Sequence, residues 1–169
     1  MLNLIIKLIE TYLFDIDSSV EQTIATNLGV KLRSPKSGAF STTYKIKGGK
    51  ILGISKSPQK ALIKLNMMDG TYDGLPIPKV YDVFKIKKDG EYVYGWVMDY
   101  VKTGRSSQAD QKRLVDTFNK FFNADNDGRF YDLHYNNIGL YKGKVVAFDF
   151  YPPDIPSSRP KNVKVRILN

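Results

Sequence analysis

The residue types with the clearest chemical potential lie between Asp132 and Asp149. Asn137 follows Asp132 by five residues, and Asp149 ends the apolar run VVAF twelve residues after Asn137. Two carboxylates and one amide oxygen that converge at strand ends form a hard-oxygen site, which suits Mg²⁺ rather than zinc. In phosphoryl transfer, one aspartate orients the attacking hydroxyl, while the asparagine and the second aspartate hold Mg²⁺ against the phosphates. The segment therefore indicates a site for magnesium-dependent phosphoryl transfer.

Aspartate and asparagine are also common turn residues, so a loop without chemistry is the alternative interpretation of this segment. Turns explain each residue singly, but they do not explain the spacing of all three together with the patterns that precede them. The single histidine and the absence of cysteine argue against a zinc enzyme. No G-x-S-x-G sequence is present, which argues against a serine hydrolase.

The elements that must position these residues are indicated by periodicity and by turn residues. The sequence predicts helices over 2–14, 18–28, 58–68 and 106–122, with Pro58 in the first turn of the third. It predicts hairpins over 42–55, around Gly48 and Gly49, and over 78–101, around KKDG. Residues 129–150 are expected to form a strand, a loop and a small hairpin. Strands segregated from helices in this way favour the α+β class.

Length and charge restrict the size of the core and the kind of partner that this protein can have. A chain of 169 residues is long enough for one well-buried core. The net charge is +9, of which residues 1–28 contribute −3 and the remainder +12. A basic body suits nucleotide phosphates or nucleic acid, although a solvated lysine-rich surface explains it equally. The apolar N-terminal run is shorter than a membrane span, so we expect a soluble cytoplasmic protein without membrane contact.

Several segments of the chain together resemble a known superfamily. DLHYNNIG followed by VVAFDF is similar to the catalytic loop and the DFG segment of protein kinases and of small-molecule kinases. Upstream, SGAFSTTY resembles a degenerate glycine-rich loop, and IPKVYDVF followed by YGWVMDYV resembles the stretch that leads to the interlobe hinge. The combination is most similar to the small early serine/threonine kinases of T7-like bacteriophages. The resemblance spans roughly residues 36–152.

The resemblance implies a role for each matching residue. Asp132 would be the catalytic base, and Asn137 and Asp149 the ligands of Mg²⁺. A second group would bind ATP: Gly38, Ala39 and Phe40 over the phosphates, and Met98 to Tyr100 beside the adenine. His134 is expected to brace its loop by hydrogen bonding.

The phosphate-binding lysine has no direct match on the expected strand. Gly53 stands where the superfamily has this lysine, and the helix over 58–68 contains no glutamate to pair with one. We predict that Lys56, three residues later, contacts the nucleotide, with Lys45 and Lys47 as alternatives from the preceding strand.

The resemblance implies a minimal protein-kinase-like fold with a strand-rich N-lobe, an added N-terminal helical pair and a much reduced C-lobe. We expect a helical segment over 1–29, the kinase-like domain over 30–152, and a basic, proline-broken tail over 153–169. The expected function is a phage-type serine/threonine kinase that acts on host proteins. The alternative is an inactive kinase-like module that binds and inhibits a host protein or a nucleic-acid machine. A small-molecule phosphotransferase is the third interpretation.

Overall fold

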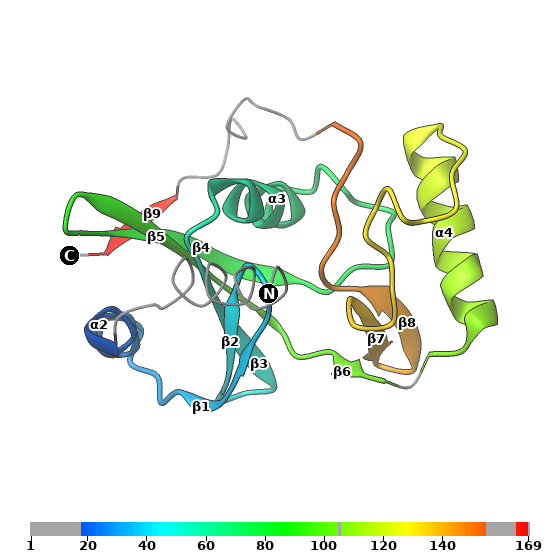
Figure 1. Ribbon diagram of the computed structural model, residues 1–169. Helices are drawn as coiled ribbons and strands as arrows, with labels where there is room; N and C mark the ends of the chain where they lie inside the picture. Colours follow the sequence, from blue (N-terminus) through cyan, green and yellow to red (C-terminus); the bar gives the residue numbers. More distant parts are fainter. Residues whose placement is uncertain (1–17, 105, 155–164, 169) are drawn as a thin grey trace, which may run out of the picture.

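The computed structural model describes residues 18–104, 106–154 and 165–168 (Figure 1). Among them, six strands form one sheet in the order β1-β2-β3-β5-β4-β9. The strands are β1 (Arg33–Ser37), β2 (Thr42–Ile46), β3 (Lys50–Ser55), β4 (Val80–Lys88), β5 (Glu91–Asp99) and β9 (Arg166–Leu168). Neighbouring strands are antiparallel except β9, which runs parallel to β4. The predicted α+β class is therefore confirmed.

The two predicted hairpins of this sheet are present. Gly48 and Gly49 connect β2 to β3 with φ angles of +83° and +66°, which glycine adopts without steric cost. Asp89 and Gly90 form the two-residue turn between β4 and β5, and both have positive φ, as such turns require. Local turn chemistry thus sets the register of both hairpins.

Two helices begin at capping side chains. Helix α3 (Pro58–Met68) begins after Ser57, whose side chain accepts the N–H of Lys60. Helix α4 (Gln108–Phe122) begins with a capping box, in which Ser107 and Asp110 each bond the backbone N–H of the other.

The large sheet is covered on both faces. Helix α3 packs on one face with Trp96 and Met98 from β5, and this core continues to α4 and Phe150. On the other face, α2 (Ser18–Leu28) places Val20 and Ile24 against the strands. Figure 1 shows α2 and α3 on opposite sides of the strands. Helix α2 corresponds to the second predicted N-terminal helix, while the first, over 2–14, lies outside the described residues.

A second sheet follows the β5 strand. It consists of β6 (Lys102–Thr103), β7 (Ile138–Tyr141) and β8 (Lys144–Ala147), in that order and all antiparallel. Helix α4 lies beside this sheet, and both are at the right of Figure 1. This part corresponds to the predicted small C-terminal half. No helix in the described residues is long and apolar enough to cross a membrane.

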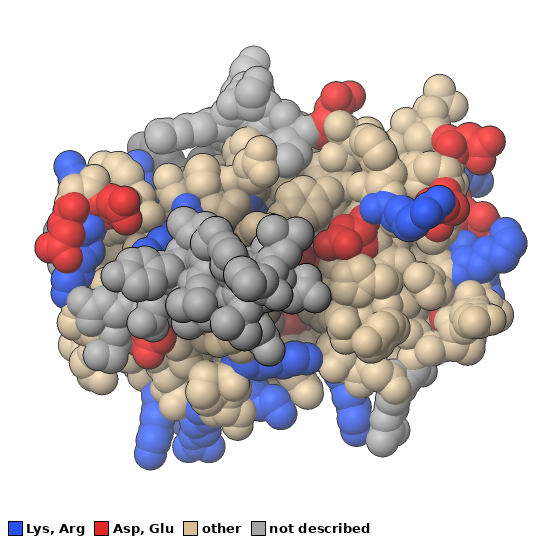
Figure 2. Space-filling model, viewed as in Figure 1, with Lys and Arg blue, Asp and Glu red and all other residues tan. Residues whose placement is uncertain are grey.

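Two expectations differ from the structure. Residues 129–132 form turns rather than a strand, because Gly128 and Asp132 both have positive φ, which breaks an extended run. Residues 166–168, expected in a basic tail, form β9 at the sheet edge. There Leu168 is buried and Arg166 pairs with Asp82 at 2.5 Å. On the face shown in Figure 2, several basic side chains project along the lower edge, below the β1–β3 end of the sheet, and others lie at the left and right of the view.

Candidate active site

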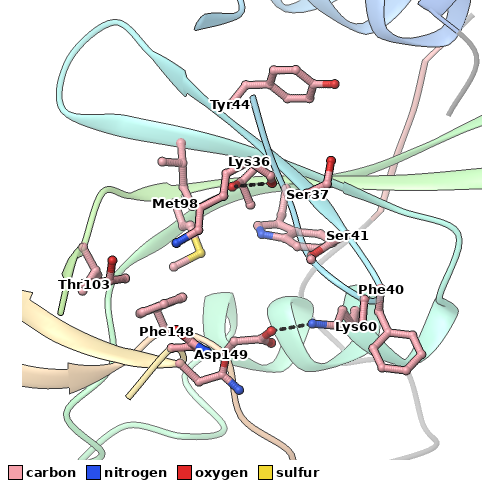
Figure 3. Close-up of a pocket in the computed structure, with 18 of the residues that line it drawn as sticks. Lys36, Ser37, Phe40, Ser41, Tyr44, Lys60, Met98, Thr103, Phe148 and Asp149 are labelled. Atoms are coloured by element: carbon pink, nitrogen blue, oxygen red, sulfur yellow. Dashed lines mark hydrogen bonds and ion pairs between the residues drawn. The ribbon is translucent and has the colours of Figure 1, made fainter. Parts of the chain in front are cut away.

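A cavity of about 840 Å³ lies between the large sheet, α3 and the loop that precedes β7. Its walls combine apolar side chains from β3 and β5 with charged groups from α3 and the loops (Figure 3). The volume is in the range of small-molecule and cofactor sites. Most of the predicted site residues line it: Gly38, Ala39, Phe40, Met98, Tyr100, Asp132, Asn137 and Asp149.

Hydrogen bonds with helix α4 hold the loop that carries Asp132. Tyr131 is fully buried, and its hydroxyl donates to Oδ1 of Asn119 on α4 at 2.9 Å. Gln111, also on α4, donates to the carbonyl of Leu133 at 2.7 Å. With these anchors on both sides, Asp132 adopts a φ of +58°, a left-handed conformation that aspartate tolerates better than most residues. Helix α4 therefore sets the position of the Asp132 carboxylate.

Asp132 and Asn137 are joined directly. The amide nitrogen of Asn137 donates to the backbone carbonyl of Asp132 at 2.9 Å and to its Oδ2 at 3.0 Å. This orientation leaves the amide oxygen of Asn137 as the acceptor available to a cation. The Asp132 side chain is 48% exposed, so its carboxylate remains accessible from solvent.

His134 braces the same loop, as expected. Its Nδ1 accepts the backbone N–H of Asn136 at 3.3 Å, and its Nε2 lies 3.1 Å from the amide nitrogen of Asn137. Nε2 lies 3.3 Å from Oδ1 of Asp132. The histidine thus contacts the carboxylate oxygen that Asn137 does not.

Asp149 is delivered to the cavity by the end of the small hairpin. The backbone N–H groups of Phe148 and Asp149 both donate to the carbonyl of Asn137, at 3.0 and 3.4 Å. These two bonds tie the segment that bears Asp149 to the loop that bears Asn137. The three predicted acid and amide side chains are therefore brought to one cavity by backbone contacts as well as by sequence spacing.

Two further lysines of this site, Lys60 and Lys64, lie on α3 and were not predicted from the sequence. Nζ of Lys60 lies 2.5 Å from Oδ2 of Asp149, across 89 residues of sequence (Figure 3). Nζ of Lys64 donates to the carbonyl of Phe148 at 2.5 Å and lies 5.7 Å from the Trp96 ring centre. Both lysines are buried, which is rare for this residue type. Their spacing of four residues, on a helix without glutamate, was the sequence signal that pointed to one shared face.

The electrostatics of Lys64 follow from its burial. The pKa of Lys64 is lowered from 10.5 to about 8, chiefly because burial removes solvent from the ammonium group; the negative charge of Asp149 opposes this shift and the positive charge of Lys60 adds to it. An ammonium group in this position is held by the Phe148 carbonyl and by the negative charge of Asp149. The α3 side of the cavity thus places two lysines beside the carboxylate of Asp149.

The structure does not bring Lys56 to the cavity. Strand β3 ends at Ser55, so Lys56 lies past the strand, at the turn into α3. The alternative Lys45 does line the cavity, with its Nζ 4.7 Å from the ring centre of Tyr100, whereas Lys47 does not. Gly53 faces Trp96 across β3 and β5, and a Cβ at this glycine would lie 2.3 Å from Cε2 of the indole. The expected lysine position is therefore filled by tryptophan.

The segment that resembles a glycine-rich loop closes one side of the cavity. The N–H of Gly38 donates to the carbonyl of Ser41 at 2.8 Å, which forms the turn between β1 and β2. Ser55 Oγ donates to the carbonyl of Phe40 and so fixes this turn to the end of β3. Phe40 itself is 51% exposed at the rim.

No protein-family model and no curated protein matches the chain. Among solved structures, it is similar to the Cydia pomonella granulovirus kinase PK-1 at 19% identity, with a TM-score of 0.41, covering 78% of this chain and 57% of that one. It is similar to the GDP and kanamycin complex of APH(2")-IIia at 16% identity, with a TM-score of 0.39, covering 62% and 40%. It is also similar to the streptomycin–ATP complex of APH(2")-IIa at 15% identity, with a TM-score of 0.38, covering 73% of this chain and 45% of that one. The chain thus spans about half the length of these structures, and at these TM-scores the similarity carries no argument about activity.

Proposed function

We propose that this protein is an ATP- and Mg²⁺-dependent phosphotransferase that acts on serine or threonine hydroxyls of proteins. The observation that carries the proposal is the set of Asp132, Asn137 and Asp149 around one cavity, with Asn137 bonded to Asp132. This set supplies the two functions that phosphoryl transfer needs. One is a carboxylate for the attacking hydroxyl, and the other is a pair of oxygen ligands for the metal.

The donor atoms fit Mg²⁺. An oxygen of Asp149 and the amide oxygen of Asn137 are hard ligands, and Mg²⁺ in such sites takes one or two carboxylates together with substrate phosphates. The described residues contain no cluster of three acidic or histidine side chains that holds a metal alone, which agrees with a site completed by a nucleotide. When bound, the metal would neutralise charge on the transferred phosphoryl group.

Each part of the chain then has a physical task. Asp132 holds the acceptor hydroxyl and accepts its proton, and Asn137 and His134 keep its carboxylate in place. The turn at Gly38 to Ser41 covers the phosphates, and Met98 and Tyr100 offer surface to the adenine. Because the Asp132 side chain is half exposed, an acceptor as large as a protein loop has access to it.

The protein acceptors we propose are host proteins in the cytoplasm of a bacteriophage-infected cell. The support for this part is the sequence resemblance to the early phage kinases. A binding module without chemistry is the second candidate, and the contact between Lys60 and Asp149 favours it, because that lysine occupies the carboxylate that would otherwise hold metal.

Transfer of labelled γ-phosphate from Mg-ATP to the protein itself and to a bacterial lysate tests the proposal. The variants are Asp132→Asn and Asp149→Asn, with Asp89→Asn in the exposed β4–β5 turn as the matched control. Asparagine is chosen because it tolerates the left-handed backbone of position 132, so the loop is preserved.

We expect each site variant to reduce transfer by about 100-fold or more and the control to match wild type. Equal transfer by wild type and Asp132→Asn would overturn the proposal. Absence of both transfer and ATP binding in wild type would overturn the proposal and favour the binding module instead.

A further inference from the structure

We propose that Lys60, on helix α3, is the residue that binds the nucleotide phosphates, in place of a lysine on strand β3. Lys64 acts as a positioning residue for the Asp149 segment. This inference rests on the proposed function, because it assigns the cation of the same site.

A steric clash excludes a lysine at position 53 of strand β3. A lysine side chain cannot leave β3 toward the cavity at Gly53, because a Cβ there would lie within 2.5 Å of three atoms of the Trp96 indole. Trp96 is 3% exposed and packs in the core between α3 and the sheet, so it has no space to withdraw. The phosphate-binding cation must therefore come from another element.

The lysines that line the cavity are the cations available to bind phosphate. Among the described residues, four lysines line the cavity: Lys36, Lys45, Lys60 and Lys64. Lys36 and Lys45 are exposed, and Lys45 lies over the Tyr100 ring on the hinge side. Only the two α3 lysines lie next to Asp149 and Phe148, where the metal and the terminal phosphates would be.

The two α3 lysines differ in their surroundings. Lys64 is enclosed and donates to the Phe148 carbonyl, a contact that orients the backbone before Asp149. Lys60 lies one turn nearer the start of α3, and Ser55 and Ser57 link this end of the helix to the turn at Phe40. An ammonium group has three donors, so Lys60 retains two for phosphate oxygens while it contacts Asp149. Figure 3 shows Lys60 between Asp149 and Phe40, at the side of the cavity that the β1–β2 turn closes.

Burial of Lys60 and Lys64 is energetically unfavourable unless an anion compensates it. Two lysines four residues apart on one helix face repel each other, and both lose solvent. A helix that served only as packing would carry apolar residues at these positions, as it does at Ile63 and Leu65. Burial of cations at a cavity wall is typical of a site that receives an anion.

The single tryptophan of the chain lines the cavity and supplies the test. Trp96 fluorescence measures the Kd for Mg-ATP and for adenosine in wild type, Lys60→Met, Lys56→Met and the control Lys87→Met, whose lysine is exposed on β4. We expect Lys60→Met to weaken ATP binding by about 10- to 100-fold with little change for adenosine. Lys56→Met and Lys87→Met should match wild type. Equal ATP affinity in Lys60→Met and wild type, or a loss confined to Lys56→Met, would overturn the assignment.

A second measurement uses unmodified protein and so does not depend on the folding of a variant. An ATP derivative with an acyl group on its terminal phosphate transfers that group to a nearby amine, with release of ATP. Mass spectrometry then locates the acylated lysine. Acylation of Lys60 supports the proposal, and acylation of Lys36, Lys45, Lys56 or Lys64 with Lys60 unmodified overturns it. If wild type binds no ATP in either experiment, the proposed function fails rather than the assignment of Lys60 alone.

Discussion

The hydroxyl of Tyr141 donates a 2.6 Å hydrogen bond to Oδ2 of Asp99 and thereby joins the small sheet to the end of β5. Tyr81, on β4, donates to the other carboxylate oxygen at 3.0 Å. Asp99 is only 6% exposed, so its charge depends on these two donors. The chain passes from the large sheet to the small sheet immediately after this residue, and the cavity lies between the two parts.

Removal of one donor should weaken this joint. We expect Tyr141→Phe to lower the free energy of unfolding by about 1–3 kcal/mol, because it leaves a buried carboxylate with one partner fewer. Urea unfolding measures the change. Tyr135→Phe is the matched control, since Tyr135 is 66% exposed and its loss of a hydroxyl should be neutral. Equal stability of both variants would show that the Asp99 contact contributes nothing.

The contact between Gly53 and Trp96 gives a second prediction. Gly53→Ala places a methyl group against the indole, and we expect it to cost about 1–3 kcal/mol of stability. Trp96→Phe removes the overlapping ring, so the double variant should be more stable than the sum of the two single changes implies. Unfolding followed by circular dichroism measures all three variants without tryptophan fluorescence. Gly38→Ala is the control, because a Cβ there meets only Ser41 O at 3.7 Å, and additive effects at positions 53 and 96 would contradict the prediction.

Lys64 predicts a dependence of stability on pH. Its pKa is lowered to about 8 in the folded protein, so above that pH the folded state releases a proton that the unfolded state retains up to about 10.5. The free energy of unfolding should therefore rise with pH in this window, by up to about 1.4 kcal/mol per pH unit from this group. The charges that face Lys64 are Lys60 and Asp149, which are the same in the variant.

Lys64→Met lacks the titrating group, so its stability should rise less than that of wild type between about pH 8 and 9.5. Urea unfolding of both proteins across this range isolates the contribution of Lys64, because other groups titrate equally in the two. Parallel curves for wild type and Lys64→Met would show that the lysine is not held at a lowered pKa.

Removal of the metal gives a fourth prediction. We expect chelation of Mg²⁺ to weaken ATP binding by wild type about tenfold or more, as measured by Trp96 fluorescence. In Asp149→Asn the same chelation should have much less effect, because a principal metal ligand is already missing, whereas Asp89→Asn should respond as wild type. An equal loss in Asp149→Asn and wild type would place the metal elsewhere.

The sequence predicted those features that local chemistry determines. Glycine turns and alternation predicted both hairpins, Pro58 and apolar periodicity predicted α3, and a common apolar face predicted α4. The spacing of Asp132, Asn137 and Asp149 indicated one cavity because all three residues lie within one short loop-and-hairpin segment. The turn at 129–132 was missed, because the positive φ of Asp132 comes from the anchoring of Tyr131 and Leu133 on α4, which is a tertiary effect.

The other features that the sequence did not predict also depend on residues that are far apart in the chain. The contact of Lys60 with Asp149 spans 89 residues, and no pattern within α3 states what its polar positions face. Strand β9 pairs in parallel with β4, so its three residues give no hairpin signal. The prediction for Lys56 assumed that the cation remained near its usual strand, whereas Gly53 and Trp96 together fill that space.

The contact of Gly53 with Trp96 also restricts how this sequence can change over generations. A substitution of Gly53 by lysine alone would meet the indole, and a smaller residue at position 96 alone would open a void in the core. We expect each of these single substitutions to lower the free energy of unfolding, so a change at one of the two positions alone is disfavoured. Descendants of this chain should therefore retain glycine and tryptophan as a pair, or replace both together.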